Sequence, residues 1–334
     1  WDNNTTPEAH MPYAMVARRP GGIGELHKTD IELPEPGPGE VALRHTAIGV
    51  NFIDVYFRTG LYPWPVDRGL ILGCEAAGVV KATGEGVHEF KPGDRVAYTL
   101  RNGAYATHRI IAARHLVAIP PSISDKIAAG CMLKGLTAHY LLHRSFKVLP
   151  RQTVLFHAAA GGVGLIAGQW LAAKGVNAIG TAGGPDKCAL ARENGYSHVI
   201  DYKSSDFVGE VMEITNGEGV HAVYDSIGKD TYPGSLQCLR TFGTLVCFGQ
   251  SSGPALDFKL SDLAAGSYTV TRPSLFHFAD DRQWLTKAAE ELFAMIDDGH
   301  VRIPINQVLP LEDVGHAHEL LESRQTTGCT ILIP

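Results

Sequence analysis

The chain has 334 residues, and at roughly 100–200 residues per domain this length predicts about two domains. Apolar residues make up 45% and charged residues 19%, which excludes wholesale disorder and allows a sizeable core. The formal net charge of −6 and the absence of basic blocks argue against a nucleic-acid or anionic-membrane partner.

The chain begins with a polar stretch, residues 1–12, which lacks the charged and apolar regions of a signal peptide and is expected to be a tail. No apolar run approaches the roughly 20 residues that span a bilayer, so a cytoplasmic protein is expected. Short strands, bounded by Pro/Gly turns at 34–39 and 91–94, are predicted over residues 40–45, 76–80 and 95–98. These features predict a small β-rich unit that ends near residue 121.

Beyond residue 121 the pattern changes to alternating strands and helices. A helix is predicted over 122–143, and helices that end at glycines are predicted over 163–174 and 186–194. Buried strands are predicted over 154–157, 177–180, 198–200, 222–224 and 245–248. The fold class is therefore α/β, with a doubly wound parallel sheet joined by right-handed crossovers. After about residue 273 we expect a helix over 281–297 and a helix-rich tail that returns to the first unit.

The six cysteines lie at positions 74, 131, 188, 238, 247 and 329. No two are three residues apart, which excludes a zinc lobe of four cysteines. Their apolar surroundings favour reduced core thiols over disulfides. A catalytic role for Cys74 is the less favoured alternative, because nothing near it in the sequence clearly lowers a thiol pKa.

A glycine loop follows the strand predicted over 154–157 and precedes the next helix. In the stretch 158–164, Ala158, Gly161 and Gly164 occupy the positions of a dinucleotide fingerprint. Small residues there allow a tight turn, close approach of a pyrophosphate, and packing of helix on strand, while the helix N-terminus offers free N–H groups. Because strand and helix flank the loop, we predict a cofactor site that includes Gly161, Gly162, Val163 and Gly164.

The cofactor is predicted to be NADPH. An NAD site usually carries an acidic residue about 20 positions after the glycine loop, but residues 181–184 contain none. Lys187 follows one helical turn later and Tyr202 lies just past the third strand, so a 2′-phosphate would be attracted. Alternatively, Lys187 is only a solvated helix residue. Asp186 is a complication, although at a helix start the dipole accounts for it.

Two strings, 49–54 (GVNFID) and 73–78 (GCEAAG), resemble the medium-chain dehydrogenase/reductase superfamily. In its zinc alcohol dehydrogenases, the positions of Asn51 and Cys74 hold a cysteine and a histidine ligand. The structural-zinc cysteines are missing as well, so the resemblance implies a zinc-independent branch with no metal. Further strings resemble the zeta-crystallin-like NADPH:quinone oxidoreductase family, namely 51–56, 60–63, 134–137, 156–164, 224–226 and 270–274.

This resemblance implies a GroES-like catalytic domain formed by residues 13–135 and 274–334, a Rossmann domain over 136–273, and a homodimer. It also implies that four residues surround the quinone and the nicotinamide: Asn51, Tyr56, Tyr62 and Arg272. The cofactor would be held by Gly162, Val163, Tyr140, Gly183, Lys187, Tyr202, Phe248, Gly249, Ser251, Phe276 and Arg324. The stretch 182–186 is richer in glycine, proline and acid than the family pattern.

Each acceptor-site residue also has a simpler explanation. Tyr56 and Tyr62 are alternatively packing aromatics with their hydroxyls at the surface, Asn51 the cap of a turn, and Arg272 the partner of a carboxylate. The fifteen histidines show no ligand spacing and are assigned no role.

Without a Lewis acid, oxidation of an alcohol is difficult, whereas hydride donation to an electrophilic acceptor such as a quinone is easier. The sequence therefore predicts an NADPH-dependent quinone reductase with a small-molecule quinone as its partner. The alternatives are an NADPH-dependent reductase of α,β-unsaturated carbonyls and a non-catalytic nucleotide- or RNA-binding protein, the latter disfavoured by the net charge.

Overall fold

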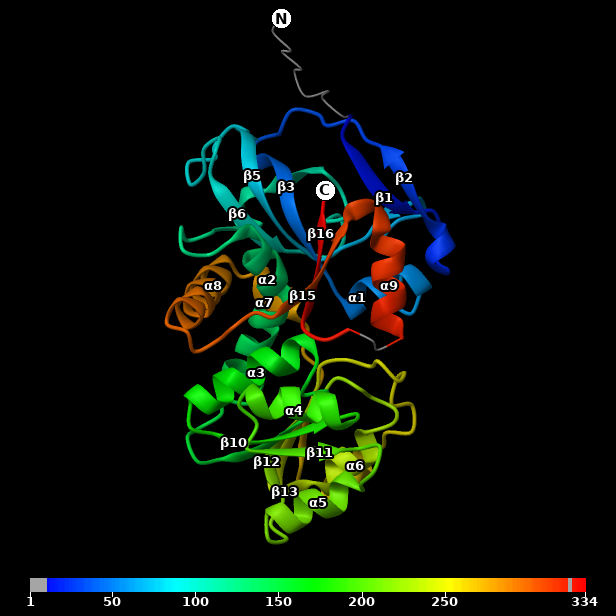
Figure 1. Cartoon of the computed structure of the whole chain (residues 1–334), viewed down its shortest axis with the longest axis vertical. Helices are drawn as coiled ribbons and strands as arrows, with labels where there is room; N and C mark the ends of the chain where they lie inside the picture. Colours follow the sequence, from blue (N-terminus) through cyan, green and yellow to red (C-terminus); the bar gives the residue numbers. More distant parts are fainter. Residues whose placement is uncertain (1–10, 324–325) are drawn as a thin grey trace, which may run out of the picture.

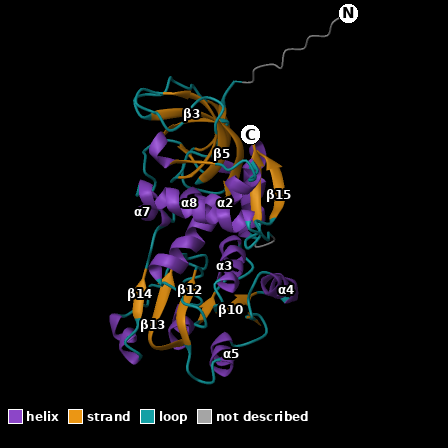
Figure 2. Cartoon of the chain, turned by 90° about the vertical axis from the view of Figure 1, so that its left-hand side faces the viewer, coloured by secondary structure: helices purple, strands orange, loops and turns teal. Residues whose placement is uncertain are grey.

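A computed structural model describes residues 11–323 and 326–334. Two sheets lie at opposite ends of the long axis, with helices α2 (Asp125–Tyr140), α7 (Leu275–Ala279) and α8 (Arg282–Asp297) between them (Figures 1 and 2). Among the described residues, none of the helices has the length and apolarity required to cross a membrane.

One sheet is parallel throughout and has the strand order β11-β10-β9-β12-β13-β14. Its strands are β9 (Thr153–Phe156), β10 (Asn177–Ala182), β11 (His198–Asp201), β12 (Val220–Asp225), β13 (Leu239–Cys247) and β14 (Thr269–Thr271). Helices α3 (Gly162–Ala173), α4 (Pro185–Glu193), α5 (Phe207–Ile214) and α6 (Tyr232–Gln237) connect them. The order reverses between β9 and β12, and ligands of such sheets bind in the crevice beyond the strands' carboxyl ends at this point. The predicted α/β class with a doubly wound sheet is confirmed.

The other large sheet has the order β15-β16-β3-β5-β6-β8, with β7 (His108–Ala112) also paired to β3. Its strands are β3 (Glu40–Val50), β5 (Glu75–Thr83), β6 (Arg95–Thr99), β8 (Leu116–Ala118), β15 (Ile305–Pro310) and β16 (Cys329–Ile333). A small sheet of β2 (Leu26–Asp30), β1 (Tyr13–Ala17) and β4 (Leu70–Ile71) lies beside it. Both ends of the chain therefore build this β-rich unit.

Helix α2 joins the two units. It is buried over most of its length, because its apolar and small residues cover every face rather than one stripe. The largest apolar cluster extends from Ala77 of β5 through Met132 of α2 to Phe156 of β9 and Leu285 of α8. The apolar core is thus continuous between the two sheets, and it holds the two units that border the crevice together.

Two predictions about elements were wrong. The first third was expected to contain only strands and turns, but α1 (Phe52–Thr59) follows β3 directly. The tail was expected to be rich in helix, but α9 (Val314–Glu322) is its one α-helix beyond α8 in the described residues, and β15 and β16 enclose it. Strand β16 pairs antiparallel with β3, which is remote in sequence, so no local pattern indicated its place in the sheet.

Candidate active site

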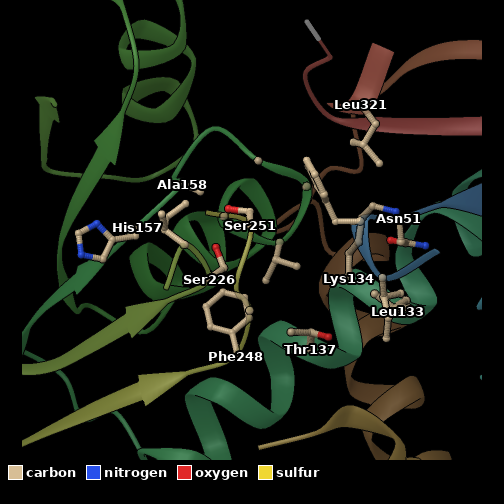
Figure 3. A pocket seen from close by; sticks show the side chains of 18 of the residues that line it. Asn51, Leu133, Lys134, Thr137, His157, Ala158, Ser226, Phe248, Ser251 and Leu321 are labelled. Atoms are coloured by element: carbon tan, nitrogen blue, oxygen red, sulfur yellow. The ribbon is translucent and has the colours of Figure 1, made fainter. Parts of the chain in front are cut away.

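A cavity of about 850 Å³ lies between the two units, at the carboxyl ends of the parallel strands (Figure 3). It brings together all the predicted site residues that the structure describes; Arg324 lies outside the described residues. Those residues are Asn51, Tyr56, Tyr62, Tyr140, Gly161, Gly162, Val163, Gly164, Gly183, Lys187, Tyr202, Phe248, Gly249, Ser251, Arg272 and Phe276.

The glycine loop forms one wall of the cavity. It begins at Ala158, whose φ of 54° lies in the left-handed region that a side chain disfavours, and it ends in the first turn of α3. A Cβ on Gly164 would lie 2.4 Å from the carbonyl oxygen of Ala158, so only glycine fits there. Because the first N–H groups of α3 have no partner within the helix, the loop can hold an anion such as a pyrophosphate.

A second region of the cavity follows the end of β10. A Cβ on Gly183 would lie 2.5 Å from the hydroxyl of Tyr202, so the two are in close contact, and Lys187 of α4 lines the cavity nearby. The carboxylate of Asp201 accepts hydrogen bonds from the N–H groups of Gly184 (2.9 Å) and Lys203 (3.0 Å), which lower its pKa. This carboxylate therefore links the turn after β10 to the turn after β11.

The opposite end of the cavity is aromatic. The ring centroids of Tyr56 and Tyr62 lie 5.3 Å apart, and burial raises the pKa of Tyr56 to about 12. Both side chains line the cavity, and their contact with an acceptor stays a prediction. A buried phenol that stays protonated is a hydrogen-bond donor at all ordinary pH values.

Arg272, the residue that directly follows β14, closes this end. Its Nη1 donates to the carbonyl oxygens of Cys247 (3.0 Å) and Gly249 (3.1 Å), and its Nη2 donates to Oε1 of Gln250 (3.3 Å). The alternative that Arg272 pairs with a carboxylate is wrong among the described residues, because its side-chain partners there carry no charge. The guanidinium fixes the strand ends that border the cavity and remains close to the hydroxyl of Tyr62.

The floor of the cavity contains a charged pair that sequence reasoning missed. Asn51 is the N-cap residue of α1, as the turn-cap alternative expects, and its side-chain amide also donates to Oε1 of Glu75 (2.9 Å). Nζ of Lys134 donates to the same oxygen (2.8 Å). Lys134 lines the cavity, and Glu75 is fully buried behind it. Both residues belong to the strings 73–78 and 134–137. The available signal was one unpaired charge of each sign in two otherwise apolar segments.

The cysteines carry no reactive chemistry in this structure. Burial raises the pKa of Cys74 well above its usual value, as predicted for a core thiol, and all six thiols are free. Within residues 11–323 and 326–334, no group of three or more His, Cys, Asp or Glu side chains is arranged to hold a metal ion.

Comparison with known protein families gives two matches. Residues 37–150 match the family described as alcohol dehydrogenase GroES-like domain, and residues 162–291 match the family described as zinc-binding dehydrogenase. The GroES-like and Rossmann-type halves expected from the resemblance are confirmed by these matches.

Individual relatives cover nearly the whole chain. A quinone oxidoreductase from Pseudomonas aeruginosa is 47% identical over 94% of this chain and 97% of its own length. A 2-haloacrylate reductase from a Burkholderia species is 41% identical over 97% of this chain and 99% of its own length. The crystal structure of Escherichia coli quinone oxidoreductase complexed with NADPH superimposes with a TM-score of 0.93 at 43% identity, and covers 96% of this chain and 100% of that one.

Proposed function

The chain belongs to the quinone oxidoreductase family of the medium-chain dehydrogenase/reductase superfamily, and from this premise we propose that it reduces a quinone with NADPH, without a metal ion. The observation that carries the proposal is one cavity lined by the glycine loop at one end and by Tyr56, Tyr62 and Arg272 at the other. Two reactants can therefore meet within a single enclosure.

The residues present fit NADPH. The N-terminus of α3, from Gly161 to Gly164, would hold the pyrophosphate, and Lys187 with Tyr202 would hold the 2′-phosphate. Glycine at 164 lets α3 pack closely on the carbonyl of Ala158, and glycine at 183 lets the hydroxyl of Tyr202 approach the backbone. When bound, NADPH supplies a hydride.

The acceptor end suits a flat, electrophilic ring. Aromatic walls at Phe52, Tyr56 and Tyr62 offer faces and edges against which a quinone can pack. The neutral Tyr56 phenol provides a donor for a quinone oxygen as it gains negative charge. The chain's own residues thus orient the ring and stabilise charge on its oxygens.

A second candidate function is the reduction of α,β-unsaturated carbonyl compounds. The relative named 2-haloacrylate reductase favours it, at 41% identity over 97% of this chain. Its acceptor would accumulate charge on a carbonyl oxygen in the same way, and a proton would then be added at carbon.

The experiment that separates the two functions compares acceptors under equal conditions. Oxidation of NADPH is followed with 1,4-benzoquinone and with a simple enone, and kcat/KM is determined for each. We expect the quinone to be the better acceptor. A larger kcat/KM for the enone would reverse the order of the two functions.

We further propose a cytoplasmic homodimer with no nucleic-acid partner. The large side chains of Phe242, Leu256 and Leu260 are 76%, 84% and 78% exposed, and the N–H of Phe242 donates to the carbonyl of Gly266 (2.7 Å), just before β14. Strand β14 is the edge of the parallel sheet. A two-fold axis would pair this edge with its counterpart in a second copy and cover the apolar side chains.

We also propose that residues 13–135 and 274–334 form one domain and residues 136–273 the other. Support comes from β16, which pairs with β3 and so joins the end of the chain to the first unit. The boundary at 135/136 falls within α2, which packs on both units.

A further inference from the structure

Lys134 extends along the cavity from the glycine loop to the acceptor end. A Cβ on Gly162 would lie 2.7 Å from Cδ of Lys134 and 2.9 Å from its Cε, so the lysine stem passes directly over the start of α3. Its Nζ donates to Oε1 of Glu75 (2.8 Å) and to the carbonyl oxygen of Val50 (3.3 Å). The head of the side chain therefore lies next to Asn51, which donates to the same carboxylate oxygen (Figure 3).

Glu75, which accepts the hydrogen bond from the Lys134 ammonium, is itself held on several sides. The second carboxylate oxygen of Glu75 accepts a hydrogen bond of 2.6 Å from the backbone N–H of Leu133. A Cβ on Gly49 would lie 2.4 Å from Oε1 of Glu75, so the strand leaves room for the carboxylate only because glycine stands there. Glu75 is fully buried and does not line the cavity, whereas Asn51 and Lys134 lie between it and the cavity.

Stability alone does not account for this arrangement. The side chains of Lys134 and Glu75 are 8% and 0% exposed, and a buried ion pair is often no more stabilising than apolar residues of similar volume. An ammonium also has three N–H donors, of which two have acceptors among the described residues. One donor is left for a molecule in the cavity.

We infer that the Lys134 ammonium is a catalytic residue that donates a hydrogen bond to the acceptor oxygen on which negative charge develops, and that Glu75 is the positioning residue that holds it beside Asn51. The inference deepens the proposed function and rests on it. Hydride addition gives the acceptor two electrons and one unit of negative charge, which water neutralises with a proton, while Lys134 keeps its own. A fixed cation in a site shielded from water stabilises such charge strongly.

The charge state of the side chain agrees with this role. Burial alone would lower the pKa of Lys134, but Glu75, Cys329 and Asp54 together outweigh burial, and the pKa is raised above its usual value. Lys134 therefore remains a cation throughout the pH range in which the protein would work.

The test uses the full chain with two variants, K134M and the double variant K134M/E75Q. K134M leaves a buried carboxylate unpaired and can fail to fold, whereas the double variant removes both charges. The amide introduced by E75Q has one acceptor oxygen, so either Asn51 or the N–H of Leu133 loses its acceptor, and thermal unfolding measures that cost. K81M is the matched control, because Lys81 is an exposed lysine on the strand that carries Glu75. The readouts are thermal unfolding, NADPH affinity by fluorescence, and kcat and KM with 1,4-benzoquinone.

The double variant is expected to unfold several degrees below the wild type, since one buried donor loses its acceptor, and to bind NADPH within about threefold of the wild type. Its kcat is expected to fall by about 100-fold, the usual effect of losing one donor to an oxyanion. A kcat above half of the wild-type value in the double variant would overturn the inference. Any loss of kcat in K134M would then come from the unpaired Glu75 carboxylate and not from the missing ammonium. A loss confined to NADPH affinity would also overturn it. Failure of the wild type to reduce any quinone would instead overturn the proposed function.

Discussion

Lys187 is the residue expected to distinguish NADPH from NADH. It lines the cavity beyond β10, and the turn there is closed by Asp201, whose carboxylate is engaged with two backbone N–H groups. A charged hydrogen bond is worth about 1.5–3 kcal/mol, so Lys187→Ala should weaken NADPH binding by about 10- to 150-fold and leave NADH binding nearly unchanged. Fluorescence titration with each nucleotide measures this.

The matched control for that prediction is Lys81→Ala, which removes an exposed cation from the other sheet. It should alter the affinity for neither nucleotide. An equal loss of affinity for NADPH and NADH in Lys187→Ala would show that Lys187 does not contact the 2′-phosphate.

Tyr56 is expected to act as a neutral donor. Burial raises its pKa to about 12, so the phenol stays protonated at lower pH and ionisation cannot limit turnover in the ordinary range. Tyr56→Phe should therefore reduce kcat with 1,4-benzoquinone by about tenfold, the value of one hydrogen bond, and by the same factor at every pH from 6 to 10. A ratio that changes with pH across this range would contradict the assignment.

The geometry of the glycine loop could be predicted from the sequence because its spacing is local. Ala158, Gly161 and Gly164 all serve one strand–helix turn, and the turn itself requires small residues. Glu75 and Lys134 could not be paired in the same way. They are separated by 59 positions and meet only because α2 packs across β5. Sequence spacing carries no information about such a contact.

Among the elements, α1 has a pH-dependent anchor. The carboxylate of Asp54 accepts hydrogen bonds from the N–H of Asn51 (2.8 Å) and the hydroxyl of Tyr105 (2.7 Å), and burial raises its pKa from 3.8 to about 6. The folded protein therefore favours the protonated acid. As pH rises from 4 to 7, ionisation of Asp54 should reduce the free energy of unfolding by about 2–3 kcal/mol.

Asp54→Asn cannot ionise and should lose this dependence. The free energy of unfolding of the variant, relative to the wild type, should rise by about 2–3 kcal/mol between pH 4 and pH 7, as measured by urea unfolding at each pH. Other groups titrate in both proteins and cancel in the difference. A difference that stays constant with pH would show that Asp54 is not perturbed.

The turn between β9 and α3 stores strain at Ala158, whose φ is 54°. A left-handed conformation costs a residue with a Cβ roughly 1–2 kcal/mol, and glycine avoids this cost. The greater conformational entropy that glycine loses on folding offsets about half of the gain. Ala158→Gly should therefore raise the free energy of unfolding by about 0.5–1 kcal/mol. Ala160→Gly, in the same loop but at an ordinary φ, should lower it; similar changes in both variants would refute the strain.

Elements with a strong local pattern could be predicted, and those defined by distant partners could not. The strand, glycine loop and helix over residues 153–173 follow one another along the chain, so one continuous segment contains the whole pattern that predicts them. Helix α1 has only 8 residues, and strand β16 has its place in the sheet because β3 lies beside it. Short elements and sheet partners depend on tertiary packing, which periodicity does not record.

At the scale of the whole molecule, the edge at β14 is expected to join two copies. Phe242→Ser combined with Leu260→Ser should remove the apolar surface beside that edge and shift the protein from dimer to monomer in light scattering. Leu149→Ser is the matched control, because Leu149 is 51% exposed and precedes β9, an inner strand of the parallel sheet, rather than the edge at β14. A wild type that is already monomeric would contradict the proposed dimer.

The central claim is that a nicotinamide donor and an acceptor meet in one cavity and react without a metal ion. The most direct measurement follows NADPH oxidation with 1,4-benzoquinone by protein that has been dialysed against a chelator and analysed for zinc. We predict full turnover by metal-free protein and no further increase on adding zinc. Turnover that disappears with the chelator and returns with zinc, or protein that never oxidises NADPH, would contradict the account.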